Sequence, residues 1–321
     1  MAQKMVSTPP TRDLTLDGRP VTIEKRLGGG RYSEVFAART RATQVVVKIA
    51  RTQPLGPEAA SATGAFAQAE ALERLTGNFG AAQVDPNLFV RAEADLLAKL
   101  GDGLFPKLLD RGEARERAFF LMESILGRTF RESAGAAKPT PAHFAALATE
   151  LDRLHDTKVM ALHGDLKPDN LMLDVKGRVR ALDPSAYGWK VESGQVKAML
   201  MTPFYNPWGD ASDVPALALT MFETYYGEHP LLNADESLPL PRCSEHLERI
   251  YHLANATGKT PLIARLLSSP PLRETAPKIT ATAEAAVYRA LHLRMEADGS
   301  FDWDDGFTSS IELVTAFGAP K

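Results

Sequence analysis

The stretch LHGDLKPDNL, residues 162–171, decides the fold of this chain because it combines three kinds of polar side chain at fixed spacing. Asp165 is a carboxylate, Lys167 a cation and Asn170 an amide, and Asp183 follows with a second carboxylate. Transfer of a phosphoryl group needs a carboxylate that orients the attacking hydroxyl, a cation beside the moving phosphate and oxygen ligands for a divalent metal. These four side chains supply that set. Magnesium prefers oxygen ligands and keeps several waters, so one amide and one carboxylate suffice from the protein.

A glycine-rich segment, GGGRYSEVF, occupies residues 28–36, far upstream of these polar side chains. It lies between two runs rich in β-branched residues, 21–27 and 44–50. We therefore expect a hairpin whose backbone amides close over phosphate groups. The chain has no G-x-x-x-x-G-K-[ST] pattern, which argues against a P-loop enzyme.

Lys48 lies inside the apolar run VVVKI, residues 45–49. A lysine in such a run must reach a cleft or a partner, because its desolvation is otherwise costly. An aspartate–proline pair at 85–86 marks a helix start, and Glu93 falls on the apolar face of that helix. The apolar side chains on this face are Phe89, Leu96, Leu97 and Leu100. We expect Glu93 to pair with Lys48, and Glu70 is the rival partner.

Together these segments resemble the protein-kinase superfamily. Residues 162–171 resemble its catalytic loop, 27–36 its Gly-rich loop, and 45–49 the strand with the ATP-binding lysine. Residues 119–127 resemble the strand that leads into the hinge, and 202–230 the substrate-facing loop and following helix of eukaryotic-type Ser/Thr kinases. The resemblance implies an α+β, two-lobed fold, with a small β-rich N-lobe, a larger α-helical C-lobe and the ATP cleft between them.

The resemblance also implies the domain organisation. Residues 1–13 would be a flexible tail, 14–123 the N-lobe, 124–130 the hinge and 131–321 the C-lobe. An insertion at about 51–84 separates Lys48 from its helix by more residues than the family generally has. This insertion could bind a regulatory partner or be a passive decoration.

The resemblance assigns a role to each site residue. Asp165 and Lys167 would be catalytic, and Asn170 and Asp183 would bind magnesium beside the ATP phosphates. Met122 would be the gatekeeper before the hinge. The residues expected to bind ATP are Gly28, Gly30, Ser33, Val35, Lys48, Glu93, Met122, Glu123 and Ile125.

Two further residues would support the catalytic loop by resemblance. Thr202 would help to hold Asp165 and Lys167, and Asp213 would brace the backbone of the loop. His155, at the end of a helix that leads into the loop, is expected to be structural. The Lys167 and Thr202 matches favour Ser/Thr over Tyr as the acceptor in a protein substrate.

The chain departs from the protein-kinase pattern at several positions. Asp183-Pro184-Ser185 replaces the usual Asp-Phe-Gly, and because proline fixes φ and lacks an N–H, a flip of this segment is disfavoured. Gly164 replaces a common arginine, so we expect activity without activation-loop phosphorylation. His-Gly-Asp and Asp-Pro are also typical of aminoglycoside phosphotransferases. A small-molecule kinase is therefore the main alternative, and a pseudokinase or nucleotidyl-transferring kinase fold is the second.

Composition is compatible with these expectations. The chain has 321 residues, of which 24% are charged, and a net charge of −3. Its basic residues are dispersed, which gives no reason to expect a nucleic-acid partner. A single cysteine, Cys243, excludes an intrachain disulfide and suits a reducing compartment. Because no apolar run approaches the roughly 20 residues of a membrane span and no signal peptide is evident, we expect a cytoplasmic protein without membrane contact.

Overall fold

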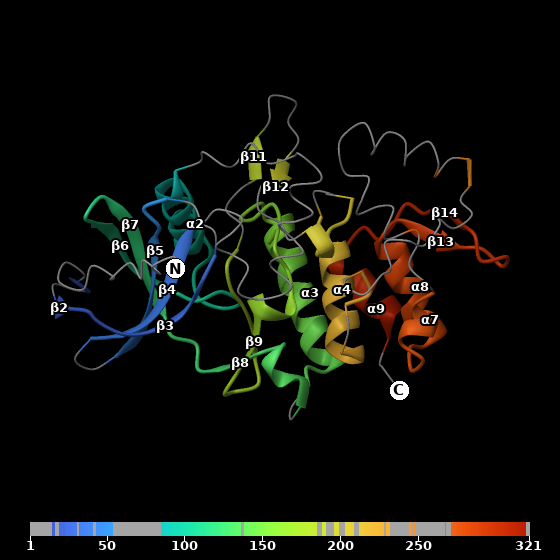
Figure 1. Ribbon diagram of the computed structural model, residues 1–321, viewed down its shortest axis with the longest axis horizontal. Helices are drawn as coiled ribbons and strands as arrows, with labels where there is room; N and C mark the ends of the chain where they lie inside the picture. Colours follow the sequence, from blue (N-terminus) through green and yellow to red (C-terminus); the bar gives the residue numbers. More distant parts are fainter. Residues whose placement is uncertain are drawn as a thin grey trace, which may run out of the picture. The chain divides into compact units, whose positions relative to one another are not determined.

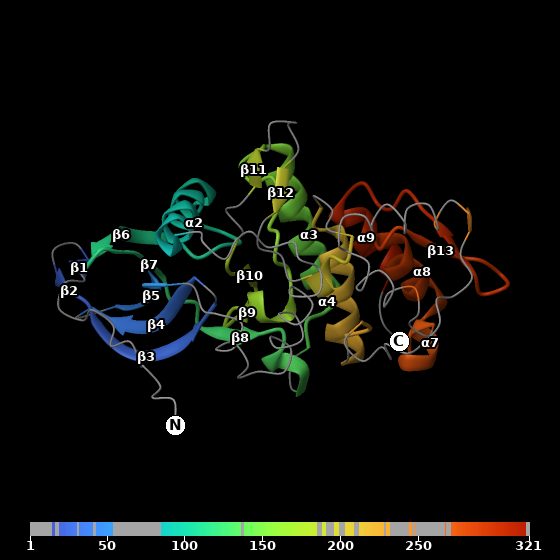
Figure 2. The same cartoon turned by 45° about the horizontal axis from the view of Figure 1, so that its top comes forward.

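A computed structural model shows the fold of the chain (Figures 1 and 2). The described residues are 15–16, 19–30, 32–40, 43–53, 85–135, 138–184, 188–190, 196–198, 203–208, 212–227, 229–231, 244–245, 247, 267 and 271–318. They fall into two compact units that join in the sequence between Ile125 and Leu126. The expected tail 1–13, Glu70, Ser185, Thr202 and nearly all of the insertion lie outside the described residues.

Unit 1 is built on a five-stranded antiparallel sheet. In spatial order its strands are β3 (Thr22–Gly29), β4 (Ser33–Arg39), β5 (Gln44–Ala50), β7 (Arg117–Glu123) and β6 (Leu108–Ala114). The short hairpin β1 (Thr15–Leu16) and β2 (Arg19–Pro20) precedes it. The expected hairpin between the runs 21–27 and 44–50 was incomplete. The Gly-rich loop joins β3 to β4, and the run 44–50 forms the following strand, β5. Strand β4, which lies between β3 and β5, carries both apolar and polar side chains, and successive ones point to opposite faces of the sheet.

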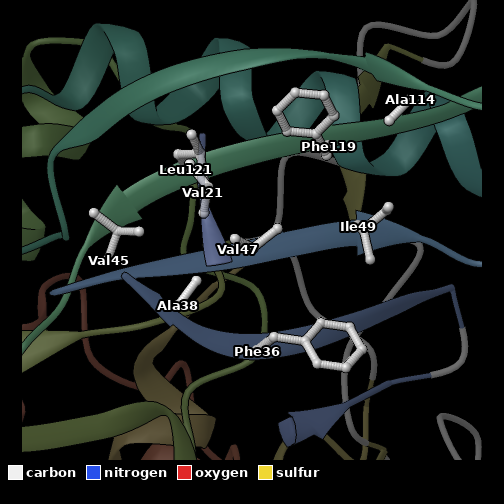
Figure 3. Close-up of a cluster of buried hydrophobic side chains, with 9 residues drawn as sticks. All are labelled: Val21, Phe36, Ala38, Val45, Val47, Ile49, Ala114, Phe119 and Leu121. Atoms are coloured by element: carbon white, nitrogen blue, oxygen red, sulfur yellow. The ribbon is translucent and has the colours of Figure 1, made fainter. Parts of the chain in front are cut away.

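One face of this sheet carries the core of unit 1 (Figure 3). Phe36, Val47 and Leu121 contribute from three central strands, Ala114 from the edge strand β6, and Val21 and the partly buried Ile23 from the start of the other edge strand, β3. The sheet is therefore curled, since side chains from both edges share one core. Successive side chains on a strand point to opposite faces, so Lys48 points away from this core.

The other face of the sheet is packed against helix α2 (Pro86–Leu100), which contacts β5, β6 and β7. The helix begins as the sequence predicts, with Asp85 accepting a hydrogen bond from the Asn87 backbone N–H at 2.9 Å and Pro86 in the first position. It ends before Gly101, whose φ of +68° favours glycine. Phe89 and Leu97 on its apolar face are buried.

Unit 2 begins with a small sheet and continues mainly as helices. The sheet has the order β10 (Val179–Ala181), β9 (Leu171–Asp174), β8 (Gly127–Thr129), and β11 (Gly188–Lys190) pairs with β12 (Val196–Ala198). Strand β8 lies inside the segment 124–130 that was expected to be only a hinge. Gly127 is required there because a Cβ atom would lie 2.1 Å from the Leu173 carbonyl oxygen on β9.

The helices of unit 2 surround a central apolar helix. Helix α4 (Val214–Tyr226) is buried at every position from Val214 to Thr224, as expected of a helix that is apolar on all sides. Helices α8 (Ala281–Ala290) and α9 (Ser310–Phe317) pack on α4 and on each other, and α3 (Pro141–Asp156) packs on α9. Asp152 of α3 also accepts hydrogen bonds from the Ser310 and Ile311 backbone amides, both at 2.9 Å.

The remaining described elements of unit 2 are short. They are the 3-10 helices η2 (Glu132–Gly135), η3 (Pro168–Asn170) and η4 (Pro203–Tyr205), the helix α7 (Leu272–Thr275), and the hairpin of β13 (Leu293–Met295) with β14 (Phe301–Trp303). Within the described residues, no helix has the length and apolar character needed to cross a membrane.

Candidate functional site

In unit 1 the Gly-rich loop is tied to the end of β5. Arg51 donates from Nε to the Gly30 carbonyl oxygen at 3.0 Å, and its backbone N–H donates to the Tyr32 carbonyl at 2.8 Å. Gly29 is needed for close approach, because a Cβ atom there would lie 2.7 Å from the Ser33 carbonyl oxygen. Gly28, Gly30 and Val35 are half-buried and Ser33 is buried. These contacts fix the backbone at Gly30 and Tyr32, on either side of the loop tip.

An aromatic pair joins this loop to helix α2. The rings of Tyr32 and Phe89 are stacked, with centroids 4.0 Å apart and an interplanar angle of 16°. Both residues are buried, at 5% exposure each. Phe89 lies one turn before Glu93 on the same face of α2. The sequence interpretation missed this contact, although Tyr32 is an aromatic residue in a polar loop.

Lys48 and Glu93 form the ion pair that the sequence predicts. Lys48 Nζ lies 2.9 Å from Glu93 Oε1 and 2.7 Å from Oε2, and both residues are buried. The alternating pattern of β5 turns Lys48 towards α2, and the helical spacing of Glu93 turns its carboxylate back towards the sheet. The pair fixes the ammonium group at a set distance from α2. Its role in binding ATP stays a prediction.

The expected adenine-binding residues lie at the end of β7. Met122 is buried within the sheet, and Glu123 and Ile125 are half-buried. The Glu123 backbone N–H donates to the Lys107 carbonyl oxygen at 2.9 Å. This bond anchors the chain at the point where it leaves unit 1.

In unit 2 the polar residues of the segment 162–171 form one hydrogen-bonded cluster. Lys167 Nζ lies 2.7 Å from Asp165 Oδ2, and Asn170 Nδ2 donates to the same oxygen at 2.9 Å and to the Asp165 carbonyl oxygen at 2.9 Å. The loop bends back at η3, where the Asn170 N–H donates to the Lys167 carbonyl at 2.9 Å. The structure thus brings together three of the four polar residues that the motif singled out.

Asp213 holds the backbone of this loop. It is buried and accepts hydrogen bonds from the His163 N–H at 2.6 Å and the Gly164 N–H at 2.9 Å. Burial acts to raise the pKa of this carboxyl, but its hydrogen bond with His155, the nearby His163 ring and the hydrogen bond from the Gly164 N–H outweigh burial and lower it. The carboxylate form of Asp213 therefore stabilises the loop, as the resemblance implied.

Two histidines flank Asp213, and their pKa values are shifted in opposite directions. Burial lowers the pKa of His163, so its ring is neutral, and Nδ1 accepts a hydrogen bond from the Asp165 N–H at 3.3 Å. His155 Nε2 lies 3.2 Å from Asp213 Oδ2; burial acts to lower the pKa of His155, but Asp213 outweighs burial and raises it. His155 acts on the loop through Asp213, in keeping with the structural role expected for it.

Gly164 has a backbone conformation that explains why glycine occurs there. Its φ is +82°, in the left-handed region that a side chain makes unfavourable. The position that carries arginine in many regulated kinases is therefore adapted to glycine in this chain.

The Asp183 segment lies next to Asn170. The Leu182 N–H donates to the Asn170 carbonyl oxygen at 2.7 Å, and Asp183 follows with a φ of +51°. A positive φ in a non-glycine residue stores backbone strain, which is common at functional sites. Asn170 Nδ2 donates to Asp165, and the binding of a cation by the Asn170 Oδ1 and the Asp183 carboxylate stays a prediction. Such a hard donor set suits Mg²⁺.

Arg131 was missed by the sequence interpretation. It follows β8 and contacts Asp169 of the catalytic loop, Glu223 of α4 and Tyr205 of η4. Glu223 is a carboxylate within an otherwise apolar buried helix, and that pattern could have indicated a cationic partner.

Solved protein-kinase domains share this fold over nearly the whole chain. A point mutant of the Mycobacterium tuberculosis PknI kinase domain matches 95% of this chain and 96% of that chain, with a TM-score of 0.52 and 20% identity. The apo form of PpkA-294 matches 97% and 99%, with a TM-score of 0.55 and 15% identity. The chain therefore has the two-lobed protein-kinase fold.

Similarity in sequence extends to curated kinases over part of the chain. Serine/threonine-protein kinase MRCK alpha of Mus musculus and of Homo sapiens is 26% identical over 146 residues, which are 40% of this chain and 8% of those proteins. MAP kinase kinase MKK1/SSP32 of Saccharomyces cerevisiae is 28% identical over 137 residues, 40% of this chain and 22% of that protein. The chain thus matches less than a quarter of these relatives. No protein-family model matches it.

Proposed function

We propose that this chain is an ATP- and Mg²⁺-dependent Ser/Thr protein kinase. The observation that carries the proposal is the cluster of Asp165, Lys167 and Asn170, whose preceding backbone at His163 and Gly164 is held by the buried carboxylate of Asp213. Its residue types are the ones that phosphoryl transfer requires. The kinase fold and the distant Ser/Thr kinase relatives support the same class of reaction.

In the proposed reaction an acceptor hydroxyl oxygen forms a bond to the γ-phosphorus of ATP, and the bond from that phosphorus to the ADP oxygen breaks. Asp165 orients the hydroxyl and accepts its proton. An ionised carboxylate has about four lone-pair sites, so it can bind Lys167, Asn170 and the hydroxyl together. Lys167 offsets negative charge on the moving phosphoryl group.

The remaining groups hold the nucleotide. Lys48, oriented by Glu93, would bind the α- and β-phosphates under the Gly-rich loop. Asn170 and Asp183 would hold Mg²⁺, which neutralises phosphate charge when bound. Because Gly164 replaces the arginine that would bind a phosphorylated activation loop, we expect this activity without prior phosphorylation.

A second candidate function is phosphotransfer to a small molecule. Two features favour it, because both are typical of aminoglycoside phosphotransferases. Gly164, with its left-handed φ, forms a His-Gly-Asp motif, and Pro184 follows Asp183 to form an Asp-Pro motif. Both candidates use the same cluster and differ only in the acceptor. A third candidate is nucleotidyl transfer, in which the acceptor oxygen forms a bond to the α-phosphorus of ATP, AMP is attached and pyrophosphate leaves.

The deciding experiment measures transfer of label from γ-labelled ATP with Mg²⁺, for wild type and Asp165→Asn. The acceptors are the chain itself, a generic basic protein and an aminoglycoside. Asp156→Asn, an exposed carboxylate at the end of α3, is the matched control. Label on serine or threonine that disappears in Asp165→Asn and persists in Asp156→Asn supports the proposal.

The other outcomes each reject part of it. Label on the aminoglycoside alone selects a small-molecule kinase, and label on tyrosine rejects the Ser/Thr preference. Transfer of label only from α-labelled ATP selects nucleotidyl transfer. Equal turnover by Asp165→Asn and wild type removes Asp165 from the reaction. A companion titration with Mg·ATP should show weaker binding by Asp183→Ala, and unchanged binding would remove Asp183 from the metal site.

A further inference from the structure

Arg131 makes a four-way connection on the outer side of the catalytic loop. Its Nε lies 2.8 Å from both carboxylate oxygens of Asp169, and its Nη1 lies 2.7 Å from Glu223 Oε1. Its Nη2 lies 3.4 Å from the Tyr205 hydroxyl, and its backbone N–H donates to the Pro168 carbonyl at 3.3 Å. Arg131 therefore binds the 3-10 helix η3 through both its side chain and its backbone.

The far end of this connection is rigid. Glu223 is buried, at 8% exposure, and lies on the central helix α4. The Tyr205 hydroxyl donates a hydrogen bond to the same carboxylate, and burial with the Glu223 charge raises the pKa of that hydroxyl, so it stays protonated. Tyr205 in turn packs on the ring of His229 at 4.6 Å. Arg131 thus links η3 to a packed part of unit 2.

The inner side of η3 is the reactive one. Asp169 lies between Pro168 and Asn170, and the Asn170 amide binds the Asp165 carboxylate. A turn of three residues that is held on its outer side by Arg131 can present Asn170 in only a narrow range of positions. The Arg131–Asp169 pair is half-exposed, so its strength comes from the bond that joins Arg131 to the buried Glu223, which is charge-assisted and stronger than a neutral hydrogen bond.

We propose that Arg131 is a positioning residue that fixes η3 and, through Asn170, the orientation of the Asp165 carboxylate. The proposal rests on the proposed function for its effect on turnover, but its effect on the loop itself is independent of that function. Arg131 touches no reacting atom in this scheme. Its guanidinium geometry matters, because a lysine offers one compact ammonium group where arginine offers a fork.

The test compares Arg131→Gln, Arg131→Lys and the control Arg128→Gln. Arg128 is an exposed arginine on β8, three residues earlier in the chain. The first readout is hydrogen–deuterium exchange of the peptide that covers residues 165–171, which needs no activity. We expect Arg131→Gln to raise the exchange rate of this peptide at least tenfold, Arg131→Lys to recover part of the protection and Arg128→Gln to match wild type.

The second readout is steady-state kinetics. We expect Arg131→Gln to lower kcat about 10- to 100-fold, the scale on which misplaced catalytic groups lose rate, while the KM for ATP changes less than threefold. Arg131→Lys should recover part of kcat. A merely structural role would lower the folded fraction and leave kcat per folded molecule unchanged.

The outcomes separate the two proposals. Unchanged exchange in Arg131→Gln overturns the positioning role whether or not the chain is a kinase. If exchange rises in Arg131→Gln but wild type shows no transfer activity, the positioning role of Arg131 at η3 is supported and the proposed function is rejected. If Arg131→Gln fails to fold, Tyr205→Phe, which removes only the hydroxyl from the network, should raise the exchange rate about two- to fivefold, and no change would again overturn the role.

Discussion

The two units hold their reactive segments by different forces. In unit 1 the Gly-rich loop and helix α2 are joined by the buried Tyr32–Phe89 stack and by the Lys48–Glu93 pair. In unit 2 the segment 162–171 is held by the buried carboxylate of Asp213, which accepts two backbone N–H groups, and by the half-exposed pair of Asp169 with Arg131. Packing and a buried ion pair respond weakly to salt, whereas a half-exposed pair is screened by salt and the Asp213–His155 contact responds to pH. The comparison predicts that the same kind of substitution has different effects in the two units.

The largest expected effect is on the buried pair of unit 1. Glu93→Ala leaves the Lys48 ammonium buried without its carboxylate, and we expect the free energy of unfolding to fall by about 3 to 5 kcal/mol. Replacing both residues, as Lys48→Met with Glu93→Leu, should recover most of this loss while leaving ATP binding impaired. Urea unfolding followed by circular dichroism measures both effects.

The matched control for Glu93 is Asp95→Ala on the exposed side of the same helix. Asp95 pairs with Arg111 in solvent, with 60% of its side chain exposed. Exposed pairs contribute about 0 to 1 kcal/mol, so this variant should be close to wild type. Equal losses in the two variants would show that the Lys48–Glu93 pair is not a dry contact.

A smaller effect is expected at the corresponding anchor of unit 2. Asp213→Asn keeps one oxygen that can accept an N–H but loses the charge, and it should lower the free energy of unfolding by about 2 to 3 kcal/mol. It should also lower turnover more than Mg·ATP affinity, because the loop that it holds carries Asp165. Urea unfolding and kinetics of Asp213→Asn and the exposed control Asp156→Asn test this. A variant with wild-type stability would mean that the hydrogen bonds to His163 and Gly164 are dispensable.

The sequence could predict two kinds of feature of the fold and the candidate site. These are arrangements within a few residues of each other and partners for charged side chains on apolar elements. Asp165, Lys167 and Asn170 lie within six residues, so one turn brings them together. Lys48 and Glu93 are far apart in the chain, but each is a charge on an apolar element, and such charges need partners. The start of α2 at Pro86 followed from its cap for the same local reason.

The parts that could not be predicted depend on contacts between distant residues without a motif. Tyr32 and Phe89 are ordinary aromatic residues until the β3–β4 hairpin folds against α2. In the sequence Arg131 looks like any surface arginine. Only its contact with the buried Glu223 distinguishes it. The strand β4 was not recognised because its polar positions, such as the buried Glu34, face an internal cluster of Arg51 and Arg117.

The next effect concerns the aromatic stack that joins the loop to α2. Tyr32→Leu and Phe89→Leu, measured singly and together, form a double-mutant cycle. We expect a coupling of about 0.5 to 1.5 kcal/mol in the free energy of unfolding, the usual value for a stacked pair. Leu88→Ala, at an exposed neighbouring position on α2, is the control and should show no coupling with Tyr32→Leu. Additive single effects would show that the two rings do not interact in solution.

The smallest expected effect is on the pH dependence of unit 2. Asp213 raises the pKa of His155 in the folded protein, so the folded state binds this proton more tightly than the unfolded state. The resulting stability is complete below the unfolded value of about 6.5 and is lost as pH rises through the higher folded pKa. The depressed pKa of Asp213 has the opposite effect, and its contribution to stability is lost only in acid, below the ordinary range of an aspartate.

Urea unfolding of wild type and His155→Gln at pH 6 and pH 8 separates the His155 contribution from that of Asp213, since glutamine can keep the contact without titrating. Wild type should lose stability relative to His155→Gln between these two values, and a constant difference would show that folding does not raise the pKa of His155.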